Sequence, residues 1–199
     1  MFIDFLGLPL LAIVSGLVVL ALYLYVGPEA EEQPKWAPAF GAAGLLALVT
    51  GLWMSLTWPL PGSFNIAFGD LAALFGLAYL AGAWSLTKGY GLGLPVVWSL
   101  FGSVTAIEVG FRLISLHMTK SPAMAGIAYI LAGVGGLLTV PAALLPKNRP
   151  LRLLAALVLL VAAALWAATT YPAYWDHLAS FSKWVPATMR VASTAAKAS

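Results

Sequence analysis

The stretch LRLLAALVLLVAAALWAATTYP, residues 151–172, decides the fold class of this chain. From Leu153 to Tyr171 it carries no charged side chain. A helix needs about 20 such apolar residues to cross the hydrocarbon core of a bilayer. Transmembrane barrels are built instead from short strands of alternating polarity, which an unbroken apolar run does not provide. The stretch therefore predicts a membrane-spanning helix.

Similar runs recur along the whole chain, separated by prolines, glycines and charged residues. The composition agrees, since 62% of the residues are hydrophobic and 9% are charged, whereas a soluble domain carries roughly 25% charged residues. We therefore predict an all-α integral membrane protein with a bundle of six transmembrane helices. The expected spans are about 6–26, 36–58, 66–87, 94–116, 123–145 and 151–171.

The last part of the chain has a different pattern. We divide the chain into a six-span domain, residues 1–172, and a segment at 173–199. Trp175, Leu178 and Phe181 follow Pro172 at helical spacing with charged residues between them. This pattern predicts a short amphipathic helix lying in the membrane interface, followed by a flexible tail of small residues. A docking segment for a partner is the alternative.

Two weaker patterns concern helix packing and symmetry. Gly7-Leu8-Pro9 recurs as Gly93-Leu94-Pro95, at the starts of the first and fourth expected spans. These spans cross in opposite directions, as in a 3+3 inverted repeat, although a match this short also arises by chance. Small residues spaced four apart predict close helix packing, and such faces also line narrow pores or subunit contacts. They are Ala43, Ala47 and Gly51; Ala128, Ala132 and Gly136; and Ala78 and Gly82.

An even number of spans places both termini on one side of the membrane, which we name side A; the opposite side is side B. Each side carries five of the ten Lys and Arg residues, so the positive-inside rule does not decide the orientation. The compact basic loop at 147–152 favours side B as cytoplasmic. We therefore expect a multi-pass protein of a prokaryotic cytoplasmic membrane with both termini outside.

Ionisable residues inside the expected spans are the most informative polar positions. Asp70, Glu108 and Arg112 all approach the membrane from side A, and His117 lies on its rim. Each buried charge costs at least about 2.5–3.5 kcal/mol at the bilayer centre, so each needs a partner or water. One interpretation is a structural Glu108–Arg112 ion pair with Asp70 as a second partner. The other is a polar funnel that contacts a solute or carries protons.

Several classes of function are disfavoured. The chain has no cysteine and two histidines, and it contains neither a His-Glu-x-x-His nor a Gly-x-Ser-x-Gly motif. We therefore expect no metal, no cofactor and no enzymatic activity, and the remaining enzymatic alternative is a site built from Asp70, Glu108 and His117. The net charge of +3 is spread along the chain, so we expect no nucleic-acid partner.

Two stretches resemble known families. WPLPGSFNIAFGD, residues 58–70, resembles the signature of a prokaryotic multi-span membrane family of unassigned function, of the domain of unknown function 981 type. LFGLAYLAGAWSLTKGYGLGLPVVWSLFG, residues 74–102, resembles the third and fourth helices of the urea/amide channel family. The second resemblance implies a ring of protomers, each with its own narrow pore. It also implies aromatics on span five and a carboxylate on span six, where this chain has only Tyr129 and no acid.

The sequence therefore favours a channel or facilitator for a small neutral polar solute such as urea or a short amide. We expect a homo-oligomer in the lipid bilayer. Aromatics narrow such a pore, and a few polar groups replace the hydrogen bonds that the solute loses with water. The alternative is a non-transporting accessory or assembly subunit of a larger membrane complex. The candidate residues of a solute pathway or polar cluster are Trp58, Asn65, Asp70, Tyr79, Trp98, Glu108, Arg112 and His117.

Overall fold

The protein is a bundle of helices in the computed structural model, which describes residues 4–26, 32–93 and 95–184. In that part of the chain six helical segments are long and apolar enough to cross a membrane, and there are no strands. Their positions confirm the six predicted apolar helices, and their length and composition suggest a multi-pass membrane protein. The elements are α1 (Gly7–Val26), α2 (Gln33–Thr57), the π-helical segment η2 (Asn65–Asp70), α3 (Leu71–Thr87), α4 (Pro95–Ser115), α5 (Pro122–Leu144) and α6 (Arg149–Ser180).

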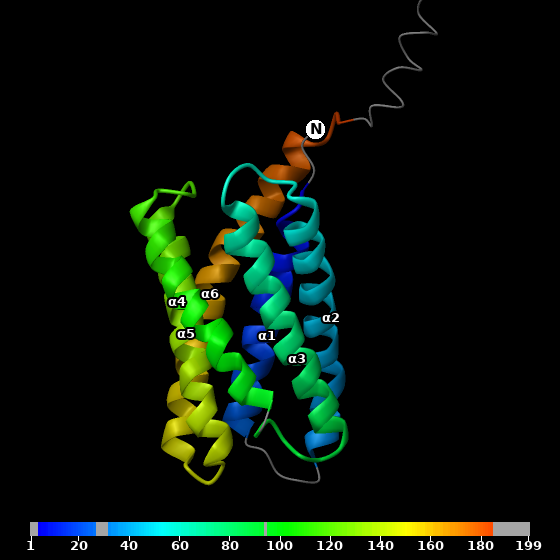
Figure 1. Ribbon diagram of the computed structural model, residues 1–199, viewed down its shortest axis with the longest axis vertical. Helices are drawn as coiled ribbons and strands as arrows, with labels where there is room; N and C mark the ends of the chain where they lie inside the picture. The colour runs from blue at the N-terminus through cyan, green and yellow to red at the C-terminus, as the bar shows by residue number, and fades with distance from the viewer. Residues whose placement is uncertain (1–3, 27–31, 94, 185–199) are drawn as a thin grey trace, which may run out of the picture.

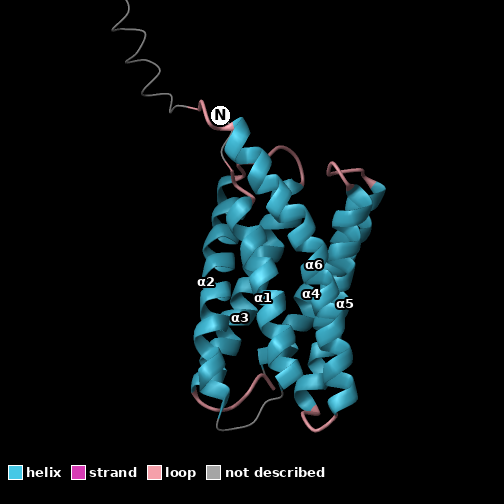
Figure 2. Cartoon of the chain, turned by 180° about the vertical axis from the view of Figure 1, so that it is seen from behind, coloured by secondary structure: helices cyan, strands magenta, loops and turns pink. Residues whose placement is uncertain are grey.

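The helices form a closed ring in chain order. Each helix packs against the next, and α6 returns to pack against α1. The contacts between α2 and α3 and between α4 and α5 are the most extensive, whereas those between α3 and α4 are much sparser. Figures 1 and 2 show these two pairs on opposite flanks, with α1 and α6 between them. This arrangement leaves an interior that all six helices surround.

Glycines allow the two best-packed pairs to approach closely. A Cβ atom at Gly76 of α3 would overlap the backbone of Leu48 in α2. In the other pair, a Cβ atom at Gly110 of α4 would lie 2.6 Å from the carbonyl oxygen of Gly126 in α5. In membranes, where lipid is as apolar as the side chains, such close backbone packing is a main source of helix association. The close packing that we predicted at Gly51 is also confirmed, since a Cβ atom there would meet the backbone of α3.

The sixth helix is longer than expected. α6 runs for 32 residues without a break at Pro172, so the amphipathic segment predicted from residue 173 is its continuation rather than a separate helix. A proline removes one backbone donor and can kink a helix, but it does not end one whose flanking residues favour helix. At 1.5 Å per residue α6 is about 48 Å long, against about 30 Å of hydrocarbon core, so it must project from the membrane. Residues 185–199, the predicted tail, lie outside the described residues.

Both ends of α6 are tied to α1. On side A, His177 Nδ1 lies 3.3 Å from the Asp4 carboxylate, which also accepts a 3.0 Å hydrogen bond from Gly7 N at the start of α1. Partial burial, and secondly the charge of Asp4, raise the pKa of the Tyr174 phenol on the projecting part of α6. On side B, Arg152 Nη1 donates to Leu24 O at 3.0 Å. The described ends of the chain therefore meet at the same end of the bundle.

Candidate functional site

The ring contains a partly open cavity of about 130 Å³ whose walls come from all six helices. None of the residues that line it is charged or a histidine. Six aromatic side chains form much of the wall: Phe40, Phe75, Tyr79, Trp98, Tyr129 and Trp166. A pocket of this kind, mostly apolar with a few polar groups, is the usual form of a small-molecule site. We therefore take the cavity as the candidate functional site.

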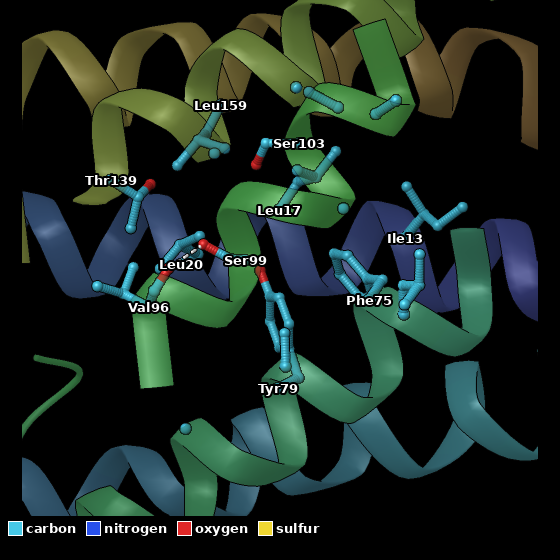
Figure 3. A pocket seen from close by; sticks show the side chains of 18 of the residues that line it. Ile13, Leu17, Leu20, Phe75, Tyr79, Val96, Ser99, Ser103, Thr139 and Leu159 are labelled. Atoms are coloured by element: carbon cyan, nitrogen blue, oxygen red, sulfur yellow. Dashed lines mark hydrogen bonds between the residues drawn. The ribbon is translucent and has the colours of Figure 1, made fainter. Parts of the chain in front are cut away.

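The first aromatic group lies on the α2–α3 wall. Tyr79 stacks on Phe75 with ring centroids 4.1 Å apart and on Phe40 with centroids 5.2 Å apart. Its hydroxyl donates a 2.7 Å hydrogen bond to Gly16 O in α1. Figure 3 shows Phe75 and Tyr79 pointing from α3 toward α1. The stacking and the hydrogen bond hold the Tyr79 ring in one orientation against the cavity.

The second aromatic group lies at the end of the cavity nearest side A. Tyr129 of α5 and Trp166 of α6 meet edge to face with centroids 4.7 Å apart, and Phe68 of η2 lies 5.7 Å from Tyr129. The Tyr129 hydroxyl donates to Ala67 O at 2.8 Å. A π-helical turn widens the backbone and is often found at functional sites. Here the π-helical turn, through this hydrogen bond and ring contact, joins α3 to the Tyr129–Trp166 pair.

Hydroxyl groups line the opposite wall. Ser99 Oγ donates to Val96 O at 2.6 Å, and Thr139 Oγ1 donates to Gly135 O at 2.8 Å, so both donors are used within their own helices. The Ser103 hydroxyl, which Figure 3 shows beside the cavity, makes no hydrogen bond within the described residues. Trp166 Nε1 is likewise buried without an acceptor there. Because buried polar groups are nearly always hydrogen-bonded, these two groups are available to form hydrogen bonds with a solute or water.

Two of the eight predicted site residues, Tyr79 and Trp98, line the cavity. Trp98 is also half exposed on the outside of α4, where its ring lies 5.8 Å from that of Phe101. It therefore stands at the boundary between the cavity and the outer surface of the bundle.

The other six predicted residues do not line the cavity. Trp58 ends α2 in a left-handed conformation and is exposed. Asn65 is fully buried and bonded to the backbone of the preceding turn. Asp70 is exposed and accepts a 2.5 Å hydrogen bond from Ser55 Oγ. The remaining three, Glu108, Arg112 and His117, are exposed at the side A half of α4 and in the turn that follows.

The intramembrane ion pair that we considered is not formed. Within the described residues, neither Glu108 nor Arg112 has an ion-pair partner, and Asp70 is bonded to Ser55 of α2 rather than to α4. The alternative, a polar funnel, is not supported either, since the cavity does not reach these charges. Spacing along a helix showed correctly that Glu108 and Arg112 share a face, but not that this face points away from the ring interior.

Sequence reasoning missed the cavity residues on α4 and α5 that carry hydroxyls: Ser99, Ser103 and Thr139. A usable signal was present, because Ser99, Ser103 and Ala106 are small residues three or four apart, a spacing that places them on one helix face. The small residues that we did single out, on α2, α3 and α5, divide between two roles: Gly51 of α2 packs against the backbone of α3, whereas others face the cavity. Ala78, Gly82, Ala132 and Gly136 line the cavity, as the narrow-pore alternative expected.

No group of three or more His, Asp or Glu side chains suited to a metal ion occurs within the residues that the structure describes. Among known families, the one described as "Protein of unknown function (DUF981)" matches residues 1–180. No curated protein and no solved structure matched the chain. The family resemblance of residues 58–70 is thereby confirmed, whereas the resemblance to urea/amide channels is not.

Proposed function

The chain belongs to the DUF981 family, whose description assigns no activity, and we propose from the cavity that it is a membrane channel or facilitator for a small neutral polar solute. The observation that carries the proposal is an uncharged cavity, lined by residues of six apolar helices, with an unbonded hydroxyl on its wall. The chemistry of this wall supports the class of solute.

The absence of charge from the lining favours a neutral solute. A bare ion inside the bilayer needs a counter-charge or a set of oriented dipoles to replace its hydration shell. The cavity lining has no ionisable Asp, Glu, Lys, Arg or His side chain. A neutral solute loses only hydrogen bonds on entry, and the Ser103 hydroxyl can both donate and accept one.

The dimensions limit the solute to a few heavy atoms. The cavity of about 130 Å³ is close to the engineered apolar cavity of about 150 Å³ that admits benzene. Urea and short amides are smaller than benzene and carry both donors and acceptors, so they suit a narrow space with an available hydroxyl and a free indole N–H. A cavity with a free hydroxyl suits a solute, whereas a non-transporting accessory subunit needs no such space, so the cavity favours transport over that alternative.

The proposal is tested by filling the cavity. Ala132 lines it and is small, so Ala132→Phe places a ring in the space that a solute would use. We expect purified protein in liposomes to speed the entry of urea or a short amide, and Ala132→Phe to abolish that increase. Stopped-flow light scattering measures the rate of liposome swelling.

Ala164 on the exposed face of α6 supplies the matched control. Ala164→Phe adds the same side chain on the outside of the ring and should leave solute entry unchanged. Equal swelling rates with and without protein, over a panel of neutral solutes, would contradict the proposed function. So would an Ala132→Phe variant as active as the unaltered protein.

A further inference from the structure

The outer face of α4 carries a continuous stripe of exposed residues, here named the α4 seam. Its members follow one another at steps of four and three residues, the 3.5-residue repeat of a helix that packs along its length against another helix. A smaller share of α4 is buried than of any other span. The seam consists of Val97, Phe101, Val104, Glu108, Phe111 and Ser115.

Two opposite charges on this face have no partner in the described part of the chain. Glu108 lies in the seam and Arg112 one turn later beside it, and both are exposed. Glu108 is seven residues from the end of α4 at Ser115, which places it about 10 Å below the side A end of the helix. Lipid would leave a carboxylate at that depth without a partner, at a cost of kilocalories per mole. The unpaired charges therefore indicate that this face binds a protein partner in the membrane.

We propose that the α4 seam docks against the α4 seam of a second copy of this chain, related by a two-fold axis perpendicular to the membrane. Two copies inserted in the same direction then bring their α4 helices together in parallel, since a two-fold contact uses the same patch on both partners. The seam supplies Val97, Phe101 and Val104 as apolar knobs on the side B side of the Glu108 layer, and Phe111 on its side A side.

The order of the charges makes this face self-complementary. Side chains on a helix lean back toward its N-terminus, so Arg112 of the second copy leans toward the level of Glu108. The two-fold axis repeats the contact, giving two reciprocal Glu108–Arg112 pairs between copies. A bidentate arginine–carboxylate contact is the strongest form of ion pair, and one polar layer in an apolar seam fixes the register of two helices. The contact does not depend on the proposed transport.

The absence of cysteine from the chain permits a direct test in the membrane. Val104 lies in the seam and is 57% exposed, and Leu157 lies on the outer face of α6 and is 59% exposed. Val104→Cys and Leu157→Cys each place one thiol at these positions. The two positions lie at similar heights from the side B ends of their helices. Under copper–phenanthroline oxidation we expect a disulfide-linked dimer from Val104→Cys and little from Leu157→Cys.

Charge exchange tests the reciprocal pairs in the Val104→Cys background. Glu108→Arg or Arg112→Glu alone sets like charges against each other, and we expect the cross-linked fraction to fall by about tenfold, which corresponds to about 1.4 kcal/mol. Co-expression of the two variants restores opposite pairs between copies and should recover the cross-link. Both residues are exposed, so folding, checked by monodispersity in detergent, should survive.

Three results would overturn the docking of two copies. One is equal cross-linking at positions 104 and 157, and a second is a cross-link at 104 to a different protein. The third is failure of the mixed Glu108→Arg and Arg112→Glu copies to recover the cross-link, since a pair formed within one helix could not be restored by mixing. A ring of copies in head-to-tail contact would also leave the two thiols at position 104 apart.

Discussion

Asn65 stabilises the turn that leads into η2. The side chain is fully buried, its amide donates to Leu60 O at 2.5 Å, and its Oδ1 accepts from Leu60 N at 3.0 Å. It thus satisfies both backbone groups of one residue in a turn that contains two prolines. Asn65, which we placed in a solute pathway or polar cluster, thus supports the turn before η2, whose Phe68 and Ala67 contact Tyr129.

We predict that Asn65→Ala lowers the stability of the protein. The substitution leaves Leu60 N–H and C=O without their partner, and an unsatisfied buried group costs about 1–3 kcal/mol. Asn148→Ala is the control, because the Asn148 side chain accepts one hydrogen bond, from Leu151 N at an exposed helix start, where loss of a cap costs about 1 kcal/mol. Thermal unfolding in detergent should show the larger decrease for Asn65→Ala; an equal decrease would contradict the role of Asn65.

Close packing of the α2–α3 pair depends on glycine at particular positions of both helices. Gly44 of α2 and Gly76 of α3 approach each other's backbone, and Gly51 of α2 lies against the backbone of Ala73 in α3. Because the neighbouring atoms belong to the backbone, they cannot move aside as a flexible side chain could. The four-residue spacing of small residues indicated this mode of packing from the sequence. It did not indicate which of the small residues face a helix and which face the cavity.

We predict that Gly76→Ala destabilises the bundle. An added methyl group would overlap the backbone of Leu48 and push α2 and α3 apart, and overpacking of this kind costs about 1–3 kcal/mol. Gly93→Ala is the matched control, because a Cβ atom at Gly93 has no neighbour within 4 Å. The apparent melting temperature in detergent should fall for Gly76→Ala only. Equal melting temperatures for the two variants would show that this contact can relax.

At the scale of the whole molecule, the contact of α6 with α1 turns a row of helices into a ring. The Asp4–His177 contact on one side and the Arg152–Leu24 hydrogen bond on the other join residues from opposite ends of the chain. This closure brings residues of α1 and α6 to the wall of the cavity. The same closure places the described ends of the chain on side A. The orientation of the protein therefore depends only on whether side A faces the outside of the cell or the cytoplasm.

We predict that side A faces the outside of the cell. Ser182→Cys lies at the side A end beyond α6, and Tyr90→Cys lies in the exposed turn between α3 and α4 on side B. Neither substitution alters a Lys or Arg residue, so neither should change the topology. A membrane-impermeant maleimide should label Ser182→Cys in intact cells and Tyr90→Cys only after lysis. The reverse pattern would place the termini in the cytoplasm.

The sequence by itself determined the all-helical class, the six apolar helices and the family, and it placed the helix bounds to within a few residues except at the end of α6. These properties follow from local hydrophobicity, proline and glycine, which act along a single helix. Only the tertiary structure decided which face of each helix looks inward. Glu108 and Arg112 share a face at any rotation of α4, but the rotation is set by packing of Gly110 on Gly126. That packing turns the charges outward and Ser103 toward the cavity.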